Sequence, residues 1–370
     1  MRVLFIGEVS GGEGTFVRNL VGHPPDGISY SCVFSDGTCT LKSVKRYTFC
    51  ERFLNAFKST AIGAGLTIKI IKTDEHYDLI HIHGIATKFV KKNVKSPIIF
   101  SASGNLWQGL LDFYNWNKLK FYRSYIGTKI LYKVLNIVDR IHNNREIVKL
   151  VTWSEFVKNT YIKFGVPEEK IEVIYPGFPE PSNTVYQKSD TVNFLFIAGK
   201  GKFQRKGGNL VLKAFKELLN MYHNIYLFLV CNKQEVPPEY LRIDNIKHLG
   251  FLNLKKLYSS IYPRMNILVL PTYADGFPTV CAEVQGYGIP VITTNIWANP
   301  EIVLNNKTGI LISPGDFKSL KNAMSILIED EQLRVKFGRK ARQHFLKKFS
   351  IDLMRYKYGL LYKSVVEGLS

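Results

Sequence analysis

Nine residues at positions 275–283, DGFPTVCAE, place two carboxylates eight residues apart across a turn. They follow a short apolar run that predicts a strand. Gly276 and Pro278 predict the turn, because proline at the first position of a helix removes no hydrogen bond. The helix that begins there would present unpaired backbone N–H groups, which can hold a phosphate, at Thr279 and Val280.

The two carboxylates belong to Asp275, at the mouth of this predicted helix, and to Glu283, one turn further along. Carboxylates accept hydrogen bonds from hydroxyl groups. The pair therefore suits the two ends of a sugar nucleotide, with ribose at one end and hexose at the other. The alternative is that Asp275 caps the helix and Glu283 is an ordinary buried side chain. Taken alone, the nine residues leave both interpretations open.

A second segment, GKGKFQRKGG at 199–208, combines four glycines with four cations. It follows a predicted strand and precedes a predicted helix. Glycine lets the backbone approach a ligand closely, and Lys200 and Lys206 can each neutralise part of a diphosphate. The spacing is not that of a Walker A loop. The segment is therefore either a phosphate cradle or a solvated loop.

The segment GEVSGGEGT at 7–15 is a glycine-rich turn that also follows a predicted strand. Gly11 and Gly12 would let a ligand approach the start of the next helix. The spacing is not GxGxxG, and no acidic residue closes a second strand about 20 residues later, which disfavours a dinucleotide site. A tight connection without a ligand is the alternative.

Short apolar, β-branched runs alternate with helical patterns, which predicts parallel sheets covered on both faces. Ligand sites in such sheets lie at the carboxyl ends of the strands. The clearest helices cover 155–164, 209–219, 279–286 and 318–328. The predicted strands cover 3–6, 29–34, 79–83, 98–101, 150–153, 172–174, 194–198, 226–230, 266–270, 291–293 and 309–312.

The segment YPGFPEPSN at 175–183 holds three prolines and one glycine, which predicts a linker between two domains. We expect an amino-terminal domain at 1–178, a carboxyl-terminal domain at 179–348 and a final helical segment at 349–370. Two α/β domains of this kind would hold their ligand in the cleft between them.

The 370 residues include 50 Lys and Arg against 30 Asp and Glu, a formal net charge of +20. The window 84–133 has nine basic residues, one acid and many aromatics, which suits an anionic membrane surface, with contacts at Lys118, Lys120 and Arg123. A solvated basic helix and stacking on single-stranded nucleic acid are the alternatives. A second run, 334–363, has ten basic residues and one acid and predicts helices with solvated basic faces.

The five cysteines are odd in number and form no CxxC pair. This argues against a disulfide framework or a cysteine-based zinc site and fits a reducing compartment. The sequence has no run of about 18 apolar residues, and its first residues lack the pattern of a secretory signal. We therefore expect a cytoplasmic protein.

Together these segments resemble the retaining GT-B glycosyltransferases of the GT4 family, also called glycosyltransferase group 1. The stretch 275–283 resembles the family's E-x7-E motif with Asp275 in place of the first Glu, and 199–207 resembles its G-R-x5-K-G loop with Lys200 in the Arg position. Further matches lie at 10–12, 78–84, 154–158, 164–167, 171–177, 300–303 and 308–312. The resemblance implies an α/β GT-B fold, with two Rossmann-like domains facing a cleft and a C-terminal helix crossing back to the amino-terminal domain.

The resemblance also implies roles for the matching residues. Glu283 would bind the donor's ribose, Asp275 would approach its hexose, and Lys200 and Lys206 would stabilise the leaving diphosphate. These four are the predicted catalytic residues. The other predicted donor contacts are Gly11, Gly12, Arg205, Gly276, Phe277, Pro278, Thr279 and Val280. The family needs no metal, and the lone HxH at 81–83 is more typical of a structural role.

Two positions depart from the family pattern. The family commonly has a His in the loop after the strand at 98–101, where this chain reads SASGN, so Ser103 or Asn105 would take that role. His83 is the third candidate on the acceptor side. Asp275 is one methylene shorter than Glu, so its contact with the donor sugar would differ or pass through water.

The resemblance thus predicts a metal-independent, retaining glycosyltransferase that uses a UDP- or GDP-sugar and no cofactor. Its acceptor would be a glycan or a lipid-linked saccharide in bacterial surface polysaccharide or lipopolysaccharide assembly. We expect peripheral contact with the inner face of the cytoplasmic membrane and no nucleic-acid partner. The alternatives are an inactive GT-B binding module, suggested by the missing His, and a sugar-nucleotide epimerase of the same fold.

Overall fold

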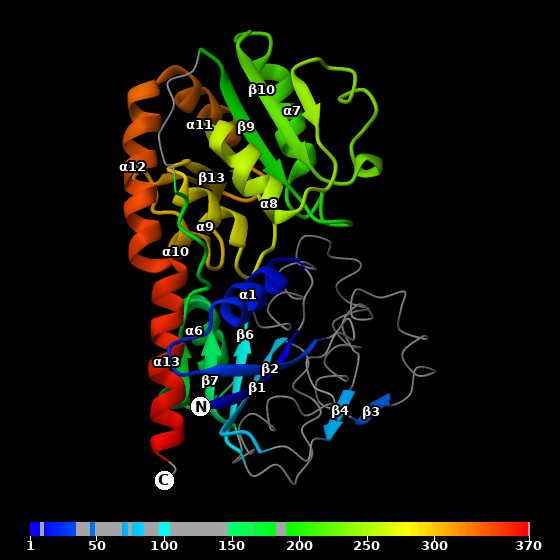
Figure 1. Cartoon of the computed structure of the whole chain (residues 1–370). Helices are drawn as coiled ribbons and strands as arrows, with labels where there is room; N and C mark the ends of the chain where they lie inside the picture. The colour runs from blue at the N-terminus through cyan, green and yellow to red at the C-terminus, as the bar shows by residue number, and fades with distance from the viewer. Residues whose placement is uncertain are drawn as a thin grey trace. The chain divides into compact units, whose positions relative to one another are not determined.

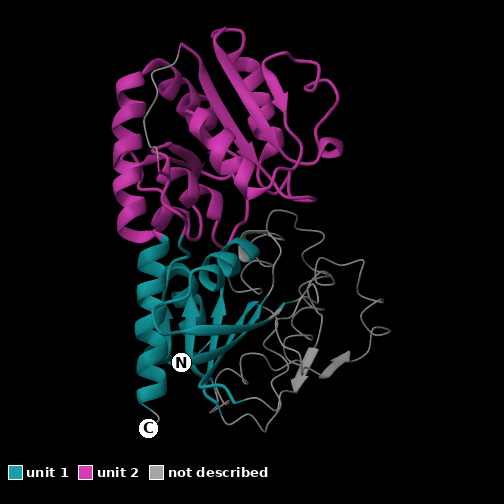
Figure 2. Cartoon of the chain, in the orientation of Figure 1, with its two compact units in different colours: residues 1–105, 119–177, 351–370 teal, residues 106–118, 178–350 magenta. Residues whose placement is uncertain are grey.

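The computed structural model describes residues 1–7, 11–34, 45–48, 69–72, 76–84, 96–103, 147–163, 165–182 and 190–368. These residues form two compact units (Figure 2). The first unit contains the described residues up to 177 together with those from 351 onward, and the second contains the described residues between 178 and 350. The described part of the chain has no helix that is both long enough and apolar enough to span a membrane.

The first unit is built on a six-stranded, wholly parallel sheet with the strand order β2-β1-β5-β6-β7-β8 (Figure 1). Its central strands β5 and β6 are buried along their full length, because their runs of Ile, Leu and Phe meet covering elements on both faces. The strands are β1 (Arg2–Gly7), β2 (Ser29–Phe34), β5 (Leu79–His83), β6 (Ile98–Ala102), β7 (Ile147–Thr152) and β8 (Ile171–Val173). The described α-helices of this unit are α1 (Gly11–Gly22), α6 (Glu155–Lys163) and α13 (Ile351–Glu367).

The second unit repeats this plan with a sheet of order β11-β10-β9-β12-β13-β14, again wholly parallel. Its strands are β9 (Val192–Ile197), β10 (Ile225–Val230), β11 (Ile246–His248), β12 (Ile267–Leu270), β13 (Val291–Thr294) and β14 (Gly309–Ile312). Its α-helices are α7 (Gly208–Leu218), α8 (Leu254–Lys256), α9 (Thr279–Gly286), α10 (Asn299–Ile302), α11 (Phe317–Glu329) and α12 (Glu331–Lys348). Two parallel sheets with helical connections confirm the predicted α/β class.

Most predicted elements exist within three residues of their expected bounds, and three strands and one helix coincide with them: 29–34, 79–83, 309–312 and 279–286. The sequence does not predict β11, whose three residues are buried, exposed and half-buried in turn and form no apolar run. It also missed the antiparallel pair β3 (Lys45–Thr48) and β4 (Lys69–Lys72), in which lysines and arginine hide the strand pattern.

The C-terminal helix α13 is anchored in the first unit by a buried hydrogen-bonded chain. Tyr362 Oη lies 2.5 Å from His81 Nδ1 and accepts a hydrogen bond from Tyr30 Oη at 3.2 Å. On the other side of the ring, His81 Nε2 lies 2.7 Å from Ser101 Oγ. Burial, together with the neighbouring His83, holds the pKa of His81 well below its usual value, so the ring is neutral at physiological pH. These hydrogen bonds therefore join α13 to the central strands β5 and β6 without burying a charge.

We predict that Tyr362→Phe destabilises the protein by about 1–3 kcal/mol, because it leaves the buried His81 Nδ1 and the half-buried Tyr30 hydroxyl without their partner. The midpoint and slope of urea unfolding measure this change. Tyr356→Phe is the matched control on the same helix, since Tyr356 is 64% exposed and should lose almost nothing. Equal stability of the two variants would show that the hydrogen bonds of Tyr362 do not anchor α13.

Candidate functional site

Two of the predicted ligand loops lie together at the carboxyl edge of the second sheet. The loop after β9 carries Arg205, and the loop after β12 carries Thr272, Tyr273 and Ala274. Strands β9 and β12 are hydrogen-bonded neighbours, so their outgoing loops must lie side by side. Arg205 O accepts hydrogen bonds from Tyr273 N at 2.8 Å and from Thr272 Oγ1 at 3.2 Å, and the Arg205 guanidinium donates to Ala274 O.

An ion pair between Lys206 Nζ and Asp275 Oδ2 completes this junction. Both side chains are nearly buried, with exposed fractions of 12% and 13%. Burial alone would raise the pKa of Asp275, but the charges of Lys206 and Arg205 outweigh it and hold the pKa below its usual value. Asp275 is therefore a carboxylate at neutral pH. Lys206 and Asp275, which the sequence analysis assigned to different parts of a donor, are in contact with one another.

The backbone of the β9 loop is fixed by glycine and by one acidic side chain. Gly207 has φ +82°, and a Cβ there would lie 2.3 Å from Pro271 O, so only glycine lets the two loops approach this closely. Glu235 accepts hydrogen bonds from Gly201 N at 3.2 Å and Phe203 N at 3.3 Å. Glu235 lies in a short 3-10 turn after β10, and no sequence signal identified it. Lys200, next to this fixed backbone, is exposed.

Helix α9 begins at Thr279 directly after Pro278, as predicted. Its first backbone hydrogen bond runs from Cys281 N to Pro278 O at 2.9 Å, which leaves the N–H groups of Thr279 and Val280 at the start of the helix, where the macrodipole favours an anion. Phe277 is buried just before the helix, with its ring centroid 6.2 Å from that of Phe349.

One turn into α9, Glu283 is 6% exposed and accepts a hydrogen bond from Tyr262 Oη at 2.9 Å. Burial raises the pKa of Glu283, and hydrogen bonds from Tyr262 and Thr279 offset part of this rise. Tyr262 packs edge-on against Tyr287, at 5.3 Å between ring centroids, and at a tilt against Tyr258 at 5.6 Å. Sequence reasoning missed this tyrosine cluster because its members lie on different elements, up to 29 residues apart.

The predicted residues of the first unit do not converge on a described site. His83 ends β5 wholly buried, with Nδ1 2.7 Å from Ser101 Oγ and its ring stacked on Trp153 at 5.2 Å. Ser103 is half-buried just after β6, and Gly11 and Gly12 begin α1. Asn105, Lys118, Lys120 and Arg123 lie outside the described residues.

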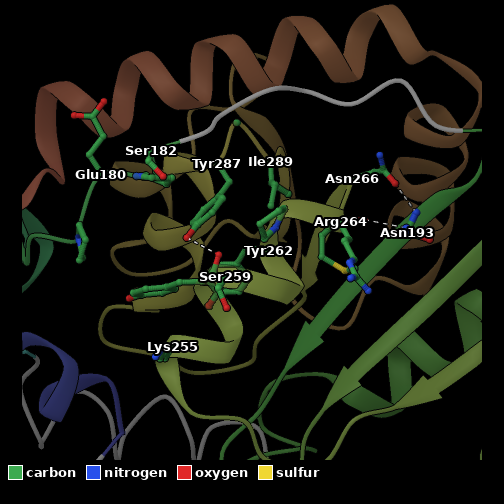
Figure 3. A pocket seen from close by; sticks show the side chains of 16 residues that line it. Glu180, Ser182, Asn193, Lys255, Ser259, Tyr262, Arg264, Asn266, Tyr287 and Ile289 are labelled. Carbon is green, nitrogen blue, oxygen red and sulfur yellow. Dashed lines mark hydrogen bonds between the residues drawn. The ribbon is translucent and has the colours of Figure 1, made fainter.

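The second unit also contains a cavity of about 990 Å³, drawn in Figure 3. Asn193, Asn266 and Ile289 line it, and they lie at the amino ends of β9, β12 and β13, so the cavity opens at the edge of the sheet opposite the ion pair. Tyr262 belongs to both places, since its side chain lines the cavity while its hydroxyl donates to Glu283. Among the described residues, no three His, Cys, Asp or Glu side chains gather as metal ligands would.

Comparison with known proteins identifies the second unit. Residues 183–344 match the family described as Glycosyl transferases group 1. The capsular polysaccharide biosynthesis glycosyltransferase CapM of Staphylococcus aureus is 28% identical over 237 residues, which cover 59% of this chain and 62% of CapM. This chain therefore matches less than two thirds of the length of that relative.

Solved structures show the same fold over the whole chain. A sucrose-phosphate synthase from Thermosynechococcus elongatus has a TM-score of 0.67 at 17% identity, with 100% of each chain covered. HepE from Anabaena, in complex with UDP and glucose, has a TM-score of 0.65 at 15% identity, with 98% of this chain and 100% of HepE covered. Together with the two parallel Rossmann-like sheets, this similarity identifies the GT-B fold.

We predict that Gly207→Ala disrupts the β9 loop, because a Cβ there meets Pro271 O in a left-handed backbone conformation. Gly201→Ala is the matched control, since Gly201 has φ +73° but nothing within 4 Å of the added Cβ. The control should lose about 1–2 kcal/mol for its backbone conformation alone, and Gly207→Ala clearly more. Urea unfolding measures both. Similar losses would mean that the loops can separate at little cost.

A second prediction concerns the pH dependence of stability at Glu283. A carboxyl group whose pKa rises on folding favours the folded state fully only below its unfolded pKa of about 4.3, and this contribution is lost as the pH rises through the higher folded value. Glu283→Gln retains an acceptor for Tyr262 without the buried charge. The variant should be more stable than the wild type at pH 7, and the difference should disappear below about pH 4.

Urea unfolding of the wild type and of Glu283→Gln at both pH values tests this prediction. Glu239→Gln, at an exposed position, controls for the loss of one negative charge. A Glu283→Gln variant that is less stable than the wild type at pH 7 would show that the hydrogen bonds to the charged form outweigh its burial.

Proposed function

We propose that this chain is a retaining glycosyltransferase with a nucleotide-diphosphate sugar as donor. The match of residues 183–344 to the family described as Glycosyl transferases group 1 supports this proposal. The observation that carries the proposal is the junction of Lys206 and Asp275 beside the start of α9. Two loops that are 69 residues apart in sequence there combine cations, a carboxylate and helix N–H groups at one edge of a parallel sheet. This set of groups suits a diphosphate that carries a sugar.

In this proposal the cations act on the leaving group. Cleavage of the bond between the sugar's anomeric carbon and the diphosphate leaves negative charge on the diphosphate oxygens. Preorganised positive charge stabilises this charge as it develops, and it is the largest electrostatic contribution to such a reaction. Lys200, exposed beside a fixed backbone, and Lys206, held by Asp275, would supply it together with the N–H groups of Thr279 and Val280.

The carboxylates would orient the two ends of the donor. Glu283 would accept hydrogen bonds from the ribose hydroxyls, and Tyr262 holds one of its oxygens in place. Asp275 would use its second oxygen for a sugar hydroxyl while the first stays paired with Lys206. The short Asp side chain suits this arrangement, because its partner comes from the adjacent loop. The low pKa of Asp275 keeps it an acceptor at neutral pH.

The acceptor hydroxyl would attack the anomeric carbon from the face that the diphosphate leaves, so that the configuration is retained. Its proton would pass to an oxygen of the departing diphosphate, which needs no base from the protein. This agrees with the first unit as described, in which His83 is wholly buried and already hydrogen-bonded to Ser101. Ser103 and Asn105 remain the proposed acceptor contacts.

The similarity to a capsular polysaccharide glycosyltransferase supports a role in bacterial surface polysaccharide assembly. The acceptor would then be a glycan or a lipid-linked saccharide, reached from the cytoplasmic face of the membrane. The donor would be a UDP- or GDP-sugar, and UDP is the ligand of the structurally similar HepE. The proposal includes no metal in catalysis.

Thermal-shift measurements with UDP, GDP, ADP and their sugars test the donor site. A nucleotide at about 100 times its Kd should stabilise the protein by roughly 2.7 kcal/mol. Lys200→Ala should weaken binding of that nucleotide about 10- to 100-fold, since it removes a charge-assisted contact. Lys247→Ala, at an exposed position on β11, is the control and should bind as the wild type does. Absence of a shift with every nucleotide would overturn the proposal.

A further inference from the structure

Of the basic residues that the run 334–363 places on α12, six fall into two groups. In the first group the cation is already engaged by the protein. The guanidinium of Arg334 donates to Leu327 O at 2.6 Å and to Ile328 O at 2.8 Å. Arg342 donates to Gly286 O and pairs with Glu180, both at 2.5 Å. These arginines hold the second unit together and are not available to a partner.

The second group lies on α12 and consists of Lys336, Arg339, Lys340 and Lys347, which we call the basic stripe. All four side chains are exposed, and none forms a hydrogen bond or an ion pair with the described residues. At 3.6 residues per turn they fall within an arc of about 100° and extend about 17 Å along the helix. The acid of α12 itself, Glu331, lies in the first turn, before the stripe begins.

The opposite side of α12 packs into the second unit. Its buried residues include Phe337, Gly338, Ala341 and Phe345, and Gly338 fits against Gly288, where a Cβ would lie 2.2 Å from Gly288 O. This packing leaves α12 along the outside of the unit (Figure 1). The core therefore fixes which side of the helix faces outward, and the basic stripe stays on the outward side. Four like charges held this close repel one another, and an anionic partner would remove that repulsion.

We propose that the basic stripe docks the protein on an anionic lipid surface. A straight row of cations on a convex helix can meet a flat array of phosphates along its whole length, and juxtamembrane Lys and Arg clusters bind such surfaces. Leu346, 40% exposed beside the stripe, can enter the interface. The exposed residues of α12 include no aromatic side chain on which a base could stack, which disfavours single-stranded nucleic acid. The inference goes beyond the proposed function, because it holds whether or not the chain transfers a sugar.

The test uses the full chain and vesicles sedimented with bound protein. One set of vesicles is neutral phosphatidylcholine, and the other contains about 30% phosphatidylglycerol as the anionic lipid. The stripe variant K336E/R339E/K340E/K347E changes the net charge by eight units. The control variant R242E/K247E/R264E/K307E changes it equally, at four exposed positions of the second unit outside α12. Circular dichroism and the midpoint of urea unfolding establish that each variant is folded, and the neutral variant K336Q/R339Q/K340Q/K347Q replaces the stripe variant if it is not.

We expect the wild type to bind the anionic vesicles, to dissociate from them as the salt concentration rises, and not to bind the neutral vesicles. The stripe variant should bind at least a hundredfold more weakly, and the control variant within about fivefold of the wild type, because the proposal assigns binding to position as well as to charge. Equal loss in both variants, unchanged binding by the stripe variant, or no binding by the wild type would each overturn it. Tighter, stripe-dependent binding to single-stranded DNA or to an acidic polysaccharide than to vesicles would assign the stripe to a polyanion instead.

Discussion

The parallel pairing of β9 with β12 is the constraint on which the candidate site depends. Parallel neighbours send their outgoing loops to the same edge, so a register fixed by Ile267 opposite Phe194 brings Lys206 to Asp275 across 69 residues of sequence. Neither loop could hold this geometry alone. The β9 loop needs Gly207 to pass Pro271, and the β12 loop is held by its hydrogen bonds to the Arg205 carbonyl. The sheet core therefore sets the chemistry of the edge, because any change of register would separate the charges.

The two carboxylates of the candidate site show how the surroundings shift the pKa of similar groups in opposite directions. Asp275 precedes α9 and lies among cations, so its pKa is low and it is charged. Glu283 lies one turn inside α9 among tyrosines, so burial raises its pKa. A buried carboxylate costs stability, and in the proposed donor site a ligand hydroxyl would share it. A charged carboxylate thus precedes α9, and a more easily protonated acceptor lies one turn inside it.

The repeated α/β pattern and the positions of the two loops, after β9 and before α9, could be predicted from the sequence, because both depend on local signals: short apolar runs, glycines at strand ends and proline at a helix start. The sequence predicted their proximity only through the rule that parallel strands share a carboxyl edge. It did not predict Tyr262, Glu235 or Ser101, since each reaches its partner from another element and no local pattern marks it. It also assigned Lys206 and Asp275 separate partners, and their mutual ion pair follows from packing, which a linear motif cannot express.

The positive charge of the protein is also only partly explained by the sequence. A net charge of +20 indicates anionic partners but not where they bind. In the structure some cations stabilise the protein itself, as Arg334 does by donating to the final carbonyls of α11 and Arg342 by pairing with Glu180. Others, such as Lys206, are buried beside a carboxylate where a ligand is expected. Only cations that the core turns outward and leaves unpaired can attract a surface, and on α12 the packing of Phe337, Ala341 and Phe345 decides which those are. The apolar side of a helix thereby determines which of its charges face solvent.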